Sequence, residues 1–123
     1  MDVSAFLDHL RGLPWVDEQL AHREDIPPRA ASHGELERPL DPLLESSLEA
    51  AGIRSLYSHQ ADAINASRNG ENVVVATPSA SGKSLCYLAP VLDALLEDRS
   101  SRALLLFPTK SLTQDQSKRI DAL

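Results

Sequence analysis

The stretch "VVVATPSASGKSLCY", residues 73–87, carries the clearest structural signal in the sequence. Its three valines form a β-branched run without polar alternation, which is typical of a strand covered on both faces in a parallel sheet. A turn of small residues follows, and the apolar pattern then predicts a helix from about Gly82 to Glu97. A strand, a turn, a lysine and a helix in this order are what a phosphate-binding loop requires.

The turn fits the P-loop pattern, a glycine and four residues followed by Gly-Lys-Ser/Thr, except that Thr77 replaces the first glycine. In such a loop the backbone N–H groups converge on the β-phosphate, the lysine reaches the β- and γ-phosphate oxygens, and the serine hydroxyl binds the Mg²⁺ that the phosphates hold. We therefore predict Lys83 as the catalytic cation and Ser84 as the Mg²⁺ ligand. The predicted nucleotide-binding residues of the loop are Thr77, Pro78, Ser79, Ala80, Ser81, Gly82, Lys83 and Ser84.

A second apolar run, "ALLLFP" at residues 103–108, follows the helix after a polar break. Strand, helix and strand in this order form a right-handed crossover between parallel strands of one sheet. Pro90 is expected to bend the helix between them. A last helix should follow Pro108, with one stripe made of Leu112, Gln116, Ile120 and Leu123. This context favours the nucleotide site over the alternative, an exposed serine-rich loop with an ordinary surface lysine.

Three more helices are expected before this strand, each with a start or stop signal in the sequence. They cover residues 3–12, residues 42–51 between the N-cap Asp41 and the stop at Gly52, and residues 58–69 between the cap Ser58 and Asn69-Gly70. Polar caps and proline favour the first turn of a helix, while glycine and asparagine tolerate the left-handed backbone that ends one.

The segment between the first two helices has a different composition. Residues 23–42 contain four prolines and no sustained period, so they indicate an extended connector over the surface. We therefore divide the chain into a helical and extended lead-in, residues 1–39, and a domain, residues 40–123.

Composition predicts a soluble protein of the reducing cytoplasm. The longest apolar stretch is interrupted by Asp93 and is shorter than the roughly 20 residues of a membrane helix, so no membrane partner is expected. The acidic start of the chain is unlike a secretory signal, and its one cysteine, Cys86, excludes an intramolecular disulfide.

The net charge of -6 is unevenly distributed along the chain. Residues 1–51 carry four arginines against 11 carboxylates, whereas residues 52–123 carry eight basic against seven acidic groups. We interpret the acidic half as a solvated surface. The net charge argues weakly against a nucleic-acid partner, but the segment that contains the loop is not acidic.

Two further stretches stand at informative distances from the loop. "LYSHQADAI" places Gln60 23 residues before Lys83, and "FPTKSLTQDQ" follows the second apolar strand. Together with "TPSASGKS" they resemble, in order, the Q motif, motif I and motif Ia of superfamily 2 helicases of the DEAD/DEAH-box type. The combination is most similar to the YprA-like, mitomycin-repair branch of DNA helicases.

The resemblance implies an ATP-dependent helicase with ATP and Mg²⁺ as cofactors, and nucleic acid, DNA rather than RNA, as the partner of the complete protein. It implies that Gln60 pairs with adenine and so selects ATP, and that Lys83 and Ser84 take the phosphate and Mg²⁺ roles. Pro108, Thr109 and Lys110 match the segment that contacts the nucleic-acid backbone. Ser111 departs from the family pattern, which often has glutamate there.

The chain lacks a part that ATP hydrolysis needs. After Lys83 no apolar strand ends in the acidic pair that would hold Mg²⁺ and orient water. We therefore expect an α/β fold, an incomplete RecA-like P-loop NTPase domain with a parallel sheet and flanking helices, truncated after motif Ia and inactive alone. Two strands with one crossover helix should leave apolar area of both strands exposed.

Two alternatives stay open at this point: a small P-loop phosphotransferase with the same loop, and a non-catalytic remnant. His59 has no identifiable carboxylate or serine partner, and we interpret it as structural. Tyr57 either packs near the adenine or is an ordinary core or surface aromatic residue. Cys86 is interpreted as a small core residue.

Overall fold

The computed structural model describes residues 2–16, 19, 22, 24–28 and 30–121. The chain forms two compact units, Met1–Ala30 and Ala31–Leu123. The division falls inside the connector that the sequence predicts. The assignment of residues 1–39 and 40–123 to a lead-in and a domain stays a prediction.

The first unit contains helix α1, Val3–Arg11, at the predicted place. The Asp2 carboxylate caps it, because Oδ1 accepts hydrogen bonds from the N–H groups of Ser4 (2.9 Å) and Ala5 (3.3 Å). The helix ends at Gly12. None of the residues of α1 is buried, so local capping rather than core packing holds this helix.

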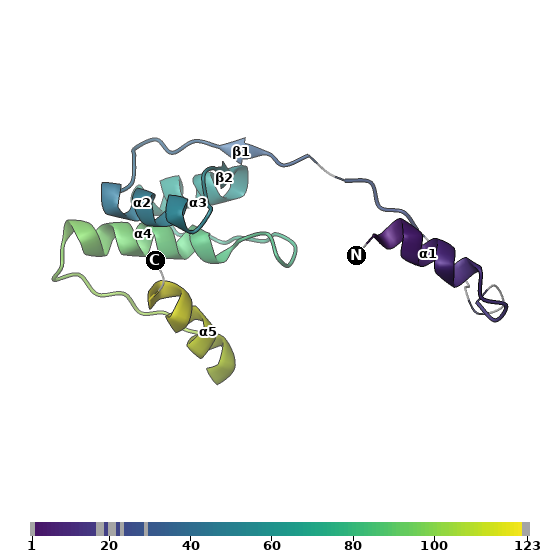
Figure 1. Ribbon diagram of the computed structural model, residues 1–123. Coiled ribbons are helices and arrows are strands. Elements are labelled where there is room, and N and C mark those ends of the chain that lie inside the picture. Colours follow the sequence, from purple (N-terminus) through teal and green to yellow (C-terminus); the bar gives the residue numbers. More distant parts are fainter. Residues whose placement is uncertain (1, 17–18, 20–21, 23, 29, 122–123) are drawn as a thin grey trace. The chain divides into compact units, whose positions relative to one another are not determined.

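The second unit contains four helices, which confirm the predicted ones (Figure 1). They are α2 (Pro42–Ala50), α3 (Ser58–Arg68), α4 (Ser84–Glu97) and α5 (Lys110–Asp121). Helix α4 packs against both α3 and α2. It is the longest, with 14 residues, and no helix in the described residues is long and apolar enough to cross a membrane.

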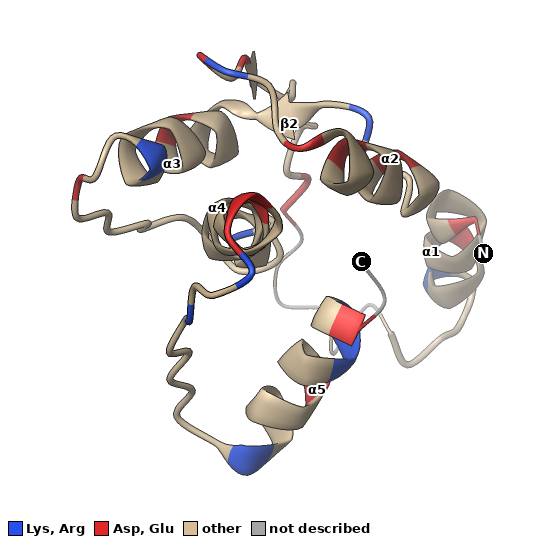
Figure 2. Ribbon diagram, turned by 90° about the vertical axis from the view of Figure 1, so that its left-hand side faces the viewer, with Lys and Arg blue, Asp and Glu red and all other residues tan. Residues whose placement is uncertain are grey.

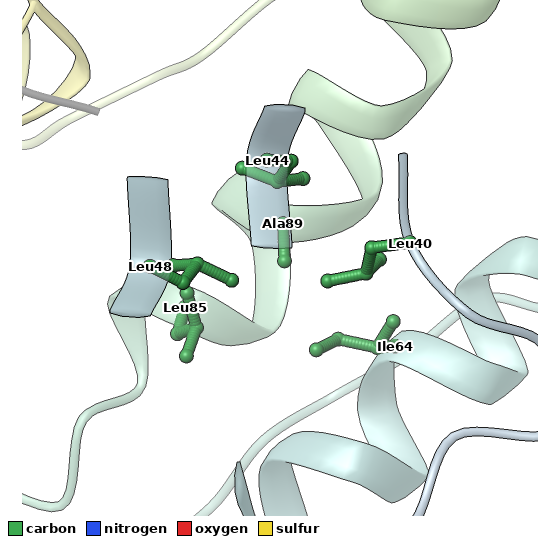
Figure 3. Packing of buried hydrophobic residues seen from close by; sticks show 6 residues of the cluster. All are labelled: Leu40, Leu44, Leu48, Ile64, Leu85 and Ala89. Carbon is green, nitrogen blue, oxygen red and sulfur yellow. The ribbon is translucent and has the colours of Figure 1, made fainter. Parts of the chain in front are cut away.

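The core of this unit lies where the first half of α4 meets α2, α3 and the connector (Figure 3). Its residues are Leu40, Leu44, Leu48, Ile64, Leu85 and Ala89. Ile64 and Ala89 are completely buried. Leu85 and Ala89 are four residues apart and therefore lie on one face of α4, which is the face that this core covers.

Local signals set the ends of α2 as predicted. Asp41 Oδ1 accepts a hydrogen bond from the N–H of Leu43 at 2.8 Å, Pro42 occupies the first turn, and Gly52 follows the helix with a φ of +84°. Leu44 and Leu48 are buried, but Ala51, which the helical period places on the same face, is exposed. The helix ends before Ala51, so the helical period no longer fixes its direction.

The start of α3 differs from the prediction by one residue. Ser58 is the first helical residue, and the N-cap is Tyr57. The Gln60 side chain reaches back and accepts the N–H of Tyr57 at 2.9 Å, so a glutamine in the first turn satisfies the donor. The helix ends at Asn69-Gly70, as predicted, where Gly70 has a φ of +81°.

Helix α4 begins two residues later than predicted, at Ser84. Gly82 has a φ of +77°, which lies outside the right-handed helical region and delays the helix. The helix continues through Pro90, which is buried and has no N–H to donate to the preceding turn. The bend expected at Pro90 stays a prediction.

The predicted parallel sheet is absent from the described residues. Their only ladder is antiparallel and joins β1 (His33–Gly34) to β2 (Leu56–Tyr57), with His33 opposite Tyr57. Residues 72–77 and 103–108 pair with no strand. The expected exposure of these apolar runs is confirmed, because Val74 is 94% exposed and Leu104 and Leu106 are 82% and 81% exposed.

A polar cluster ties α3 and α4 to the connector. Arg68 Nε lies 3.2 Å from Asp93 Oδ2, and both side chains are largely buried. Arg68 also donates to the carbonyl oxygens of Arg38 (2.6 Å) and Pro39 (2.8 Å). Asp93 Oδ1 accepts the N–H of Asp41 at 2.7 Å, so one ion pair anchors three segments.

Candidate phosphate-binding site

The predicted loop is a turn closed on itself at the start of α4 (Figure 1). Ala80 and Gly82 both have left-handed backbone, with φ of +61° and +77°. The hydroxyl groups of Thr77 and Ser81 lie 2.6 Å apart and join the two ends of the turn. The chain therefore turns here before α4 begins at Ser84.

The Lys83 ammonium folds back over this turn. Its Nζ donates to the carbonyl oxygens of Thr77 at 2.8 Å and Pro78 at 2.6 Å, and it lies 3.4 Å from the Ser81 hydroxyl. The sequence prediction requires the charge to lie at the loop, and the structure places it there. A phosphate entering the turn would meet a cation already held inside it.

Three N–H groups at the junction between the loop and α4 are available to a ligand. The carbonyl of Gly82 accepts from Leu85 N and that of Lys83 from Cys86 N, both at 3.1 Å, so the helical ladder starts there. Within the described part of the chain, the N–H groups of Gly82, Lys83 and Ser84 donate to no protein acceptor. Together with the positive end of the helix dipole, these donors form a site for an anion.

Helix α3 supplies two side chains to the loop. Gln60 Nε2 donates to the carbonyl of Gly82 at 3.0 Å, and the Gln60 side chain is buried. His59 Nε2 donates to the carbonyl of Ser81 at 2.9 Å. The structure thus brings the predicted Gln60 to the loop, and it adds His59, whose contact the sequence analysis missed. The available signal was that His59 precedes Gln60 in the first turn of the same helix.

The Gln60 amide keeps hydrogen-bonding capacity for a ligand. An amide side chain has two donor hydrogens and two acceptor lone pairs. The contacts with Gly82 and with the N–H of Tyr57 use one donor and one acceptor. One donor and one acceptor of the amide therefore remain without a hydrogen-bond partner in the described chain.

A cavity of about 690 Å³ opens beside Gln60. Its polar and aromatic lining includes His33, Arg54, Tyr57, Gln60, Ser84 and Arg119, together with Gly82 of the loop. This volume lies within the range of about 300–1,000 Å³ that small-molecule sites occupy. Tyr57, one of the residues that line this cavity, is 42% exposed.

The residues that are predicted to contact nucleic acid make only local hydrogen bonds at the start of α5. Pro108, Thr109 and Lys110 are exposed at the start of α5, where the Thr109 hydroxyl accepts the N–H of Leu112 at 3.3 Å. Figure 2 shows basic residues at both ends of this helix. No hydrogen bond or ion pair joins these three residues to the loop in the part of the chain that the structure describes.

Helix α5 is instead linked to α4 through Tyr87. The Tyr87 hydroxyl donates to Gln116 Oε1 at 2.9 Å, and its ring lies 6.3 Å from that of Phe107. Gln116 is buried. The sequence analysis placed this residue on the stripe of the helix but did not predict its burial. Leu123, the last residue of that stripe, lies outside the described residues.

Cys86 is buried next to the site, as expected for a small core residue. Burial raises the pKa of its thiol, and this effect outweighs its backbone hydrogen bond and the nearby charge of Lys83, which both act in the opposite direction. The sulfur lies 4.0 Å from the carbonyl oxygen of His59. Cys86 is therefore held as a neutral thiol between α3 and α4.

Comparison with known proteins identifies relatives of this chain. Residues 57–123 match the model of the DEAD/DEAH box helicase family. The chain is 39% identical over 107 residues to the ATP-dependent helicase YprA of Bacillus subtilis, which covers 87% of this chain and 14% of YprA. It is 50% identical over 91 residues to the ATP-dependent helicase hrq1 of Schizosaccharomyces pombe, which covers 73% of this chain and 9% of hrq1.

Solved structures give the same relationship. The crystal structure of the DUF1998 helicase MrfA bound to DNA and AMPPNP superimposes with a TM-score of 0.75 at 38% identity, covering 89% of this chain and 16% of MrfA. The structure of MrfA bound to DNA gives a TM-score of 0.74 at 42% identity, with 79% and 13% covered. The chain thus corresponds to a small part of much longer relatives, and its fold is that of a partial RecA-like domain.

Proposed function

The chain belongs to the DEAD/DEAH box helicase family, and from this we propose that residues 40–123 are the N-terminal portion of a RecA-like domain that binds MgATP. In the complete protein, ATP hydrolysis would drive the unwinding of nucleic acid. The family match decides against a small phosphotransferase. What distinguishes the proposal from an inert remnant is whether the loop binds a nucleotide.

The observation that supports ATP binding best is the arrangement of the loop. The Lys83 ammonium contacts two loop carbonyls, and the three N–H groups of Gly82, Lys83 and Ser84 have no acceptor in the described chain. A triphosphate would replace the carbonyl contacts of Lys83 with stronger, charge-assisted hydrogen bonds to its oxygens. It would also satisfy the free N–H groups, so two separate requirements of the loop point to the same ligand.

The Mg²⁺ that accompanies ATP would neutralise charge on the phosphates and be held partly by the Ser84 hydroxyl. Ser84 fits this role because it is the first residue of α4 and is only half-buried. Serine oxygen is a hard ligand that suits this ion. Ser84 therefore orients the nucleotide through its metal, while Lys83 contacts the phosphates directly.

Selection of adenine is assigned to Gln60. Its remaining donor and acceptor belong to a side chain that already holds the loop, and the cavity of about 690 Å³ beside it has room for a base. Tyr57 also lines this cavity, so a base placed there would lie beside its side chain. The base and the phosphates would then be read by adjoining parts of one site.

The nucleic-acid partner is proposed to be DNA, contacted by Pro108, Thr109 and Lys110. The relative MrfA was crystallised bound to DNA. In this chain the three residues are exposed at the N-terminal end of α5, where a helix dipole and a lysine both favour a phosphate. They are expected to hold the backbone of the DNA rather than to read its sequence.

The two exposed apolar runs, residues 72–77 and 103–108, are proposed to be strands of the parallel RecA-like sheet. Their side chains are apolar on both faces, yet Val74, Leu104 and Leu106 are exposed in the described chain. Strands of this composition are normally covered on both sides. Further strands of the same sheet would cover these residues.

The proposal is tested by measuring MgATP binding to the chain with Lys83 intact and with Lys83→Ala, by isothermal titration calorimetry. Loss of the ammonium should weaken binding by at least about tenfold, because a charge-assisted contact contributes about 1.5–3 kcal/mol. Lys118→Ala is the matched control, since Lys118 is an exposed lysine in the last turn of α5. Equal affinities for the Lys83→Ala variant and the unaltered chain would remove Lys83 from the site.

A further inference from the structure

His59 contacts the loop, but the proposed ATP site assigns no role to this residue. Its Nε2 lies 2.9 Å from the carbonyl oxygen of Ser81, and the contact is partly buried. A carbonyl oxygen can only accept, so Nε2 must carry a proton and donate it. His59 is therefore a fixed donor directed at the backbone of the loop.

The geometry of the peptide bond transmits this contact to the other side of the loop. In a trans peptide the C=O and the following N–H point in opposite directions, and the described chain has no cis peptide. A donor that holds the Ser81 carbonyl therefore turns the N–H of Gly82 away from α3. Gln60 does the same one residue later, because it holds the Gly82 carbonyl and so directs the N–H of Lys83.

The His59 ring is itself held in place. It stacks on Tyr57 with ring centroids 5.9 Å apart and planes 11° apart, and Tyr57 stacks in turn on His33 at 5.5 Å. His33 and Tyr57 are partners in the ladder between β1 and β2. The short ladder thus fixes a row of three rings, and the last ring in the row holds the loop.

We infer that His59 is a positioning residue of the phosphate loop, which holds the Ser81 carbonyl so that the N–H of Gly82 faces the bound phosphate. The inference rests on the proposed nucleotide site and deepens it. The held carbonyl lies between Ala80 and Gly82, the two residues of the turn that have left-handed backbone. Because His59 orients an N–H group that contacts phosphate, it should affect the affinity for phosphate-bearing ligands and not the affinity for the base alone.

The test compares His59→Phe with His59→Gln in the 123-residue chain. Phenylalanine keeps a ring to stack on Tyr57 but removes the donor, whereas glutamine keeps a donor and removes the ring. In His59→Phe the Kd for MgADP and for inorganic pyrophosphate should rise about five- to tenfold, while that for adenosine stays unchanged. In His59→Gln both phosphate ligands should bind within about twofold of the unaltered chain.

A measurement on the unaltered chain keeps the inference testable even if a variant fails to fold. In the uniformly ¹⁵N-labelled chain, the ring of His59 should be protonated at Nε2, and the amide signal of Gly82 should shift when pyrophosphate is added. A His59 proton located on Nδ1 alone, or a Gly82 amide that does not respond to bound pyrophosphate, overturns the inference.

The outcomes separate this inference from the proposed function. If neither MgADP nor pyrophosphate binds the unaltered chain, the proposed nucleotide site fails. If both bind and Lys83→Ala weakens them while His59→Phe does not, the site stands and the role of His59 is wrong. Equal weakening by phenylalanine and glutamine also overturns it, because the donor would then not be what matters.

Discussion

Gly82 is the residue at which the phosphate loop, α3 and α4 meet. Its φ of +77° favours glycine, and its carbonyl accepts hydrogen bonds from both Gln60 and Leu85. A Cβ at this position would also collide with Nε2 of Gln60. Glycine is therefore required here twice, once by the backbone conformation and once by the close approach of a neighbouring side chain.

This double requirement predicts that Gly82→Ala destabilises the chain more than Gly70→Ala. Gly70 has a similar φ of +81° but open space where a Cβ would be. We expect a loss of about 1 kcal/mol in the free energy of unfolding for Gly70→Ala, from backbone strain alone. Gly82→Ala should lose about 2–3 kcal/mol, because displacement of Gln60 is added.

Urea denaturation followed by circular dichroism measures both losses. Gly52→Ala is a second control, since Gly52 also has positive φ and nothing near its missing Cβ. If all three glycine variants lost the same stability, the contact between Gly82 and Gln60 would have no energetic weight.

At the scale of elements, the packing of α3 on α4 depends on apolar and polar contacts together. Ile64 and Ala89 are completely buried between helices, while Arg68 and Asp93 form an ion pair at 3.2 Å with side chains only 14% and 13% exposed. Such a pair is costly to break, because removal of one member leaves the other charge buried without its partner. Since α3 carries His59 and Gln60, this packing sets the position of both side chains at the loop.

Asp93→Ala should lower the free energy of unfolding by about 3 kcal/mol, because it leaves Arg68 without a counter-charge and the N–H of Asp41 without an acceptor. Asp93→Asn retains an oxygen for Asp41 and should lose less. The measurement is chemical denaturation of both variants, together with their affinity for MgATP. An alanine variant as stable as the asparagine variant would show that the hydrogen bond to Asp41 contributes nothing.

In the second unit as a whole, the apolar run at residues 103–108 has one exposed face. Leu104 and Leu106 are more than four-fifths exposed, whereas Leu105 and Phe107 between and beside them are half-buried. This alternation is that of an extended segment with one face against the protein. Phe107 contacts the ring of Tyr87 on α4, which identifies part of the covered face.

Because neighbouring leucines lie on opposite faces, we expect their glutamate variants to differ in the free energy of unfolding. Replacing Leu104 and Leu106 together by glutamate should change the free energy of unfolding by no more than about 0.5 kcal/mol, because both side chains are already in water. It should also reduce self-association, which sedimentation velocity measures. Leu105→Glu should cost more than about 1 kcal/mol, because it places a charge on the covered face. Equal stabilities for the two variants would contradict this assignment of faces.

The helices and the composition of the loop could be predicted from local signals in the sequence. Asp41, Gly52 and Gly70 mark helix ends through contacts within a few residues, and the order of strand-like run, turn, lysine and helix predicts a phosphate loop around Lys83. Such features depend on local backbone preference and on hydrogen bonds between near neighbours, both of which a linear sequence displays.

Four features depend on contacts between distant parts of the chain and could not be predicted from the sequence. They are the β1–β2 ladder, the burial of Gln116, the absence of a paired parallel sheet from the described residues and the contact of His59 with the loop. His59 and Ser81 are 22 positions apart, and nothing near either residue encodes their meeting. Their distance follows from how α3 packs on α4, which is the sum of many side-chain contacts. A strand likewise needs a partner in space, so an apolar run alone cannot determine its pairing.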